Sequence, residues 1–121
     1  MEINATAREI NENARAKGFY EDYEYLQQIL KYDDRALAFV NKLWLSTRLM
    51  LVVSELGEAM EGIRKDNLDH EPGSGGFQEE IADAQIRLLD LAWAVGDPEA
   101  TIDAKMKYNQ NRPHKHGGKK L

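Results

Sequence analysis

The chain of 121 residues contains no cysteine. That absence excludes disulfides, Cys-ligated zinc and thiol catalysis, and it fits a reducing compartment. No segment reaches about 18 consecutive apolar residues, and the charged first residues lack the apolar stretch of a signal peptide. The sequence therefore predicts a soluble, cytoplasmic protein without a membrane span.

Strand signals are also scarce, because the sequence has no alternating apolar run and no Asn-Gly or Asp-Gly pair between apolar stretches. Helical signals recur instead, and the predicted fold class is all-α. One domain is expected over residues 1–111, followed by a basic tail at 112–121. The expected elements are helices at 4–17, 34–65, 77–95 and 98–111, a short helix or irregular segment at 19–30, and a loop at 66–76.

Charge is distributed unevenly along the chain. The net charge is −5, and residues 112–121 hold four cations and no acid, which leaves −9 for residues 1–111. An acidic body with a basic tail is poorly suited to gripping duplex DNA, so nucleic acid is not an expected partner. The same division can collect metal cations in one place and phosphate in another, or it can be an ordinary solvated surface with an unstructured tail.

The expected helix at 34–65 is unusual in its apolar content. Its middle, LWLSTRLMLVV, is apolar nearly all round. A helix of that kind is usually buried on more than one side. In so small a protein, the second side is most simply covered by another subunit.

Two pairs of acidic residues lie on the two longest expected helices: Glu55 with Glu58, and Glu80 with Asp83. Residues three apart project from one helical face, and both pairs have apolar neighbours. The short loop allows the helices to pack antiparallel, so that four carboxylates converge. Hard oxygen ligands in that number suit Mg²⁺ or Mn²⁺. Solvent-facing acids on ordinary amphipathic helices are the alternative.

The last expected helix ends in cations and an amide. Lys105 and Asn109 lie four residues apart on one face, and Arg112 precedes Pro113. Such donors can clamp phosphate oxygens, or they can simply complement the helix dipole.

Three stretches, SELGEAMEGIRK, EEIADAQIRLLDLA and KMKYNQNRPHKHGGKK, together resemble the MazG-like all-α nucleoside triphosphate pyrophosphohydrolases, which are related to dimeric dUTPases and dCTP pyrophosphatases. The resemblance covers most of the chain and is least clear over residues 19–34. It implies a helical bundle completed by oligomerisation into a homodimer or homotetramer. It also implies Mg²⁺-dependent cleavage of a (d)NTP between the α and β phosphates, giving (d)NMP and pyrophosphate, as in nucleotide-pool house-cleaning.

The resemblance also implies roles for individual residues. The catalytic metal ligands would be Glu55, Glu58, Glu80 and Asp83. The substrate contacts would be Lys105, Asn109, Arg112, Lys115 and Lys119. Ser54 stands where many members have another glutamate, so the residue that orients the attacking water is left open. Glu79 and Glu61 are candidates for a base or a supporting role, and solvent-exposed helical acids are the alternative for both.

Other interpretations of the sequence remain. Trp44 is a candidate for the base pocket, although an aromatic residue at helical spacing more often belongs to a core. A di-iron carboxylate bundle requires Glu-x-x-His motifs, and neither long helix contains histidine. The non-enzymatic alternative is a helical dimerisation or interaction module.

Overall fold

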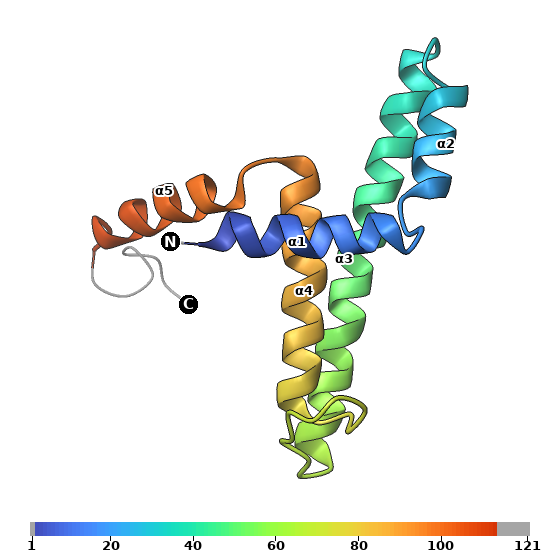
Figure 1. Ribbon diagram of the computed structural model, residues 1–121. Coiled ribbons are helices and arrows are strands. Elements are labelled where there is room, and N and C mark those ends of the chain that lie inside the picture. Colours follow the sequence, from blue (N-terminus) through green and yellow to red (C-terminus); the bar gives the residue numbers. More distant parts are fainter. Residues whose placement is uncertain (1, 114–121) are drawn as a thin grey trace.

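The computed structural model describes residues 2–113, and these residues form helices without any strand (Figure 1). The helices are α1 (Ile3–Ala16), α2 (Glu21–Ile29), α3 (Asp34–Arg64), α4 (Phe77–Val95) and α5 (Pro98–Gln110). The predicted all-α class and the four long helices are confirmed, and the segment at 19–30 is helical. Asp97 caps α5 by accepting a hydrogen bond from Ala100 N, with Pro98 at the first position of the helix.

Helices α3 and α4 pack antiparallel and form the most extensive contact between two helices among the described residues (Figure 1). Two glycines allow their connected ends to approach closely. A Cβ on Gly62 would lie 2.8 Å from the backbone nitrogen of Phe77, and a Cβ on Gly76 would lie 2.3 Å from the carbonyl oxygen of Asp69. A larger residue at Gly62 would force the end of α3 away from the start of α4, and a larger residue at Gly76 would force the loop apart at Asp69.

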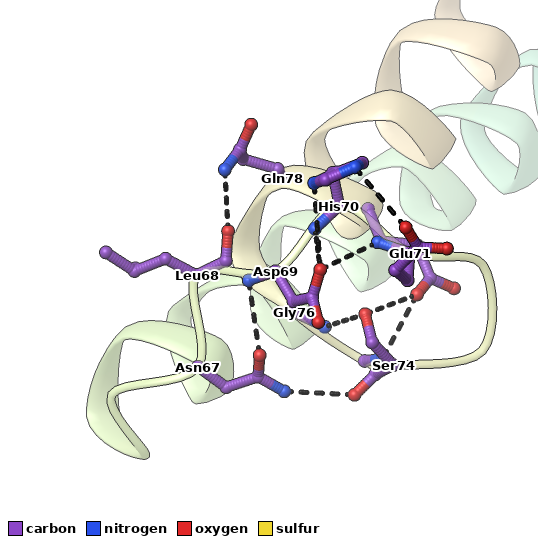
Figure 2. Close-up of polar contacts among 10 residues, drawn as sticks. Asn67, Leu68, Asp69, His70, Glu71, Ser74, Gly76 and Gln78 are labelled. Carbon is purple, nitrogen blue, oxygen red and sulfur yellow. Dashed lines mark hydrogen bonds and ion pairs between the residues drawn. The ribbon is translucent and has the colours of Figure 1, made fainter.

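The loop between these helices is held by its own hydrogen bonds. Figure 2 shows the Asn67 side chain donating to the Ser74 carbonyl, and the Gln78 side chain donating to the Leu68 carbonyl. The Glu79 carboxylate accepts from the backbone nitrogens of Gly73 and Gly75 and from the Ser74 hydroxyl. These bonds, led by that from Gly73, lower the pKa of Glu79. The loop therefore fixes the register of α3 against α4.

Helix α1 lies across α4, in front of the α3–α4 pair in Figure 1. Asn11 Nδ2 donates to Asp90 Oδ1 at 2.8 Å, and the Tyr20 hydroxyl donates to the same oxygen at 2.9 Å. The start of α1 is also tied to the start of α5, because Asn4 Nδ2 donates to Asp97 Oδ1 and Ile3 N donates to Glu99 Oε1. These long-range bonds connect the two ends of the described chain.

The core of one chain is small. Its buried apolar residues are Ala7, Tyr20, Val52, Ala59, Ala84 and Leu91. Many large apolar side chains are exposed instead, several of them on α3. By length and mean hydropathy alone, α3 is the one described helix that could cross a membrane, and only 6% of its most apolar window is buried.

Candidate metal centre

Three carboxylates meet between α3 and α4. Oxygen atoms of Glu55, Glu80 and Asp83 all lie within 4.8 Å of one another. We call these three residues the acid cluster. Glu80 is buried, and the other two are partly buried.

Helical periodicity brings these acids together. On α3, Glu55 lies in the stripe that also contains the buried residues Val52, Ala59 and Gly62, with steps of three and four residues. On α4, Glu80 precedes the buried Ala84 by four residues. The stripes face each other, so their acids occupy the interface between the helices.

Glu58 is not a member of the acid cluster. Three residues correspond to about 300° of rotation, so Glu58 points about 60° to one side of Glu55. This is enough to take it off the interface stripe, and its side chain is exposed. Three of the four expected metal ligands are therefore brought together by one chain.

The acid cluster is electrostatically crowded. Glu80 shares a hydrogen bond with Glu55, and this bond, together with burial and the nearby negative charges, raises the pKa of Glu80 to about 7. Burial is also the main reason that the pKa of Asp83 is raised, with repulsion from Glu55 adding to it. Like charges at this spacing disfavour the ionised form, which is why the pKa values of Glu80 and Asp83 both rise.

Arg87 supplies the one nearby positive charge among the described residues. Its Nε lies 2.9 Å from Oε1 of Glu55, whose side chain is only 16% exposed. Arg87 also opposes the rise in the pKa of Asp83. Arg87 is not among the site residues predicted from the sequence, although its position four residues after Asp83 on the same helical face is a signal that identifies it.

The chemistry of the donors fits a hard divalent cation. The acid cluster offers carboxylate oxygens and no sulfur or imidazole, which suits Mg²⁺ or Mn²⁺ better than a transition metal that prefers softer ligands. Mg²⁺ usually retains several water ligands, so three converging carboxylates are sufficient to hold it. A cation there would relieve the repulsion among the carboxylates.

The expected phosphate contacts lie elsewhere. Lys105 and Asn109 are exposed on α5, which extends away from the α3–α4 pair (Figure 1). Lys105 Nζ lies 4.5 Å from the centre of the Tyr108 ring, and the Arg112 guanidinium lies 5.8 Å from it. One chain does not bring these cations to its acid cluster. Lys115 and Lys119 lie outside the described residues.

The two acids considered for activating water have structural partners. The Glu79 carboxylate accepts hydrogen bonds from Gly73, Ser74 and Gly75 in the loop between α3 and α4. Glu61 is exposed and forms an ion pair with Arg64 at 2.8 Å. Neither belongs to the acid cluster.

Trp44 lies about 16 Å from Glu55 along α3, since eleven residues separate them. Its ring stacks on Tyr23 with centroids 4.2 Å apart. It also lines a cavity of about 330 Å³ at the other end of the helix pair from the acid cluster. Both its ring contacts and its distance assign Trp44 to packing of α2 on α3 rather than to the acid cluster.

No family model, curated protein or solved structure matches the chain. The resemblance to MazG-like enzymes therefore rests on the motifs themselves.

Proposed function

We propose that this protein is a Mg²⁺-dependent nucleoside triphosphate pyrophosphohydrolase that cleaves the bond between the α and β phosphates. The observation that carries the proposal is the convergence of Glu55, Glu80 and Asp83 from two antiparallel helices within 4.8 Å. The raised pKa of Glu80 supports it, since perturbed carboxylates gather at functional sites more often than on ordinary surfaces. The motif resemblance supplies the substrate class and the bond.

The acid cluster would hold the cation through its three carboxylates. When bound, Mg²⁺ supplies Lewis-acid stabilisation of negative charge on the phosphates. With a cation bound, Glu80 and Glu55 would both serve as ionised carboxylate ligands. Arg87 keeps Glu55 oriented through its hydrogen bond. Glu58, exposed three residues further along α3, is the fourth metal ligand that the motif resemblance implies.

The cations of α5 have the proposed role of contacting the substrate phosphates. Because α5 extends away from the α3–α4 pair that holds the acid cluster, we assign this contact to a neighbouring copy in a homo-oligomer. Lys105→Ala should then raise KM more than it lowers kcat. Mixing this variant with Glu80→Gln should restore part of the lost activity, whereas a contact made within one chain predicts no recovery.

Product analysis tests the reaction. The protein should be incubated with each (d)NTP and Mg²⁺, with Mn²⁺ as the second metal. Monophosphate and pyrophosphate are the expected products, and orthophosphate as the primary product would contradict the assigned bond.

Matched variants test the site. Glu80→Gln and Asp83→Asn should each abolish hydrolysis, and Glu61→Gln should retain it because Glu61 lies outside the acid cluster on the same helix as Glu55. Full activity in both cluster variants would contradict the site. A chain that neither bound Mg²⁺ nor hydrolysed any nucleotide would instead be the non-catalytic helical module.

A further inference from the structure

The guanidinium group of Arg87 uses only one of its donors within the described part of the chain. Its Nε donates to Oε1 of Glu55 at 2.9 Å, and its Nη1 and Nη2 atoms make no hydrogen bond with a described residue. An arginine carries several N–H donors in one plane, so most of them remain available. The side chain is 42% exposed, which leaves these donors open to solvent.

Arg87 lies on the same face of α4 as the two acids that this helix contributes to the acid cluster. At about 100° per residue, it lies about 20° round the helix from Glu80 and about 40° from Asp83. Its charge acts on Asp83 as well as on Glu55, because it opposes the rise in the pKa of Asp83. A ligand that is bound at the acid cluster and extends along α4 toward its C-terminal end therefore meets Arg87.

Pairing with Glu55 accounts for only part of this arrangement. Glu55 is 16% exposed, and a largely buried carboxylate needs a counter-charge. Arginine and carboxylate groups frequently meet through two parallel N–H···O bonds, whereas the contact here is the single bond from Nε. The edge of the guanidinium that carries Nη1 and Nη2 is therefore free to bind a second anion.

The charge of the site indicates which anion this edge suits. Three ionised carboxylates with one bound divalent cation keep a net negative charge, which repels phosphate. Arg87 offsets that charge from within the same chain. Lys105 and Arg112 do not offset it there, because both contact the Tyr108 ring on α5. Phosphate oxygens match the planar donors of a guanidinium group and bind them bidentately.

We propose that Arg87 binds a phosphate oxygen of the substrate triphosphate through Nη1 and Nη2, while its Nε keeps the bond to Glu55. The proposal rests on the proposed hydrolase function and adds a substrate contact made by the same chain that holds the cation. The cations of α5 would approach from the neighbouring copy, and Arg87 from the acid cluster itself. Its positive charge would then stabilise the negative charge that develops on the phosphates as the bond breaks.

A purely positioning role for Arg87 is the alternative. Arg87 would then matter only because it orients Glu55 as a metal ligand, and its loss would weaken Mg²⁺ binding whether or not nucleotide is present. A substrate contact predicts a different pattern. Loss of the free donors should weaken nucleotide binding, and loss of a positive charge beside the acid cluster should leave Mg²⁺ binding intact or strengthen it.

Two substitutions separate these roles. In Arg87→Gln the amide nitrogen takes the position of Nε, so the bond to Glu55 is kept while the outer donors and the charge are removed. Arg87→Met has nearly the same length and donates no bond. Calorimetry would measure binding of Mg²⁺ alone, and then of the α,β-imido analogue of a (d)NTP that the wild type hydrolyses. Arg87→Gln should bind Mg²⁺ at least as tightly as the wild type and the analogue at least ~10-fold more weakly, whereas Arg87→Met should bind both more weakly.

Arg64→Gln is the matched control, because Arg64 is an exposed arginine that pairs with Glu61 outside the acid cluster. It should change neither affinity, and circular dichroism would establish that every variant remains helical. Arg87→Lys, which keeps a counter-charge for Glu55, should bind the analogue with intermediate affinity and gives the same comparison if Arg87→Gln fails to fold.

Two results would overturn the proposal and leave the hydrolase function intact. One is wild-type affinity for the analogue in Arg87→Gln, and the other is a loss of analogue affinity matched by an equal loss of Mg²⁺ affinity. A wild type that hydrolyses no (d)NTP would overturn both the proposed function and the role of Arg87, so the two failures are distinguishable.

Discussion

Helix α4 contributes to two sets of polar side chains in the interior, which differ in whether each carboxylate has enough hydrogen-bond donors or cations around it. Near its C-terminal end, Asp90 accepts hydrogen bonds from Asn11 and Tyr20, which link α1 and the start of α2 to α4. Near its N-terminal end, Glu80 and Asp83 meet Glu55 across the interface, with Arg87 as the nearby cation. One group consists of a single acid with neutral donors, and the other has three acids.

This difference separates a structural role from a functional one. The Asp90 group matches each donor with an acceptor, as stable buried polar networks do. The acid cluster keeps carboxylates close together at the cost of repulsion, and such strain is retained where a ligand relieves it. We therefore expect changes at Asp90 to act on stability, and changes at the acid cluster to act on binding and catalysis.

The largest expected effect is on catalysis. Glu80→Gln removes one anionic ligand while preserving the shape of the side chain, and should lower kcat at least ~100-fold, which corresponds to about 2.7 kcal/mol. Its melting temperature in the absence of Mg²⁺ should equal or exceed that of the wild type, because the repulsion is reduced. Steady-state kinetics and calorimetry would measure the two quantities. If Glu80→Gln were instead much less stable than the wild type and its folded molecules had a normal kcat, the acid cluster would be structural in the same way as the Asp90 group.

Asp90→Ala should produce the reverse pattern. It leaves the buried Tyr20 hydroxyl without its acceptor and removes one of the two acceptors of Asn11 Nδ2, the other being the Tyr20 hydroxyl oxygen, and should lower the free energy of unfolding by about 2 kcal/mol. The kcat of the remaining folded protein should be within about twofold of the wild type, as expected for a change that acts on stability alone. Urea denaturation, combined with kinetics at low temperature, would measure both. Asp103→Ala, at an exposed position on α5, is the matched control.

The two groups should also differ in their response to pH. The pKa of Glu80 is raised to about 7, so its proton competes with a metal ion, and Mg²⁺ affinity should fall about tenfold between pH 8 and pH 6. Without metal, the unfolded chain loses this proton near pH 4.5 and the folded chain near pH 7. Stability attributable to Glu80 is therefore present below pH 4.5 and is lost as the pH rises to 7.

The pKa of Tyr20 is raised to about 12 by burial and by its bond to Asp90, so the phenol remains protonated throughout this range. Isothermal titration with Mg²⁺ at each pH would measure the affinity, and thermal melts would measure stability. In Glu80→Gln, the Mg²⁺ affinity and the stability should no longer change with pH in the way expected from Glu80. If either quantity still showed this change, the titrating group would be another residue.

The smallest effects concern the glycines of α3. Gly62→Ala would place a methyl group against the backbone at Phe77 and should destabilise the protein by about 1 kcal/mol, since the loop must shift to admit it. Gly57→Ala meets no atom within 4 Å and should stabilise the helix by about 0.5 kcal/mol. Thermal melts would measure both. Mg²⁺ binding should weaken in the first variant alone, because only there does the register of Glu55 against Glu80 change.

Helix positions and the meeting of the two acidic helices could be predicted from the sequence, because caps, glycines and apolar spacing are local signals. Whether Glu58 joins the acid cluster depends on the rotation of α3 about its axis, which is a property of its packing on α4 and not of the local sequence. The buried bonds of Asn11 and Tyr20 with Asp90 join residues more than 65 positions apart, so no local pattern reveals them. The direction of α5 depends likewise on its bonds to Asn4 and Ile3.

The hydrogen bonds of α1 to α4 and to the start of α5 have a consequence for the order in which the helices fold during synthesis. The partners that α1 bonds on α4 and at the start of α5 are translated about 80 to 95 residues after it. When α1 leaves the ribosome, the surface that it covers does not yet exist. Contacts of such wide sequence separation form late, so the hairpin of α3 and α4 should fold first and α1 should dock last. A protease pulse during refolding should therefore cut within α1 after α3 and α4 have become protected.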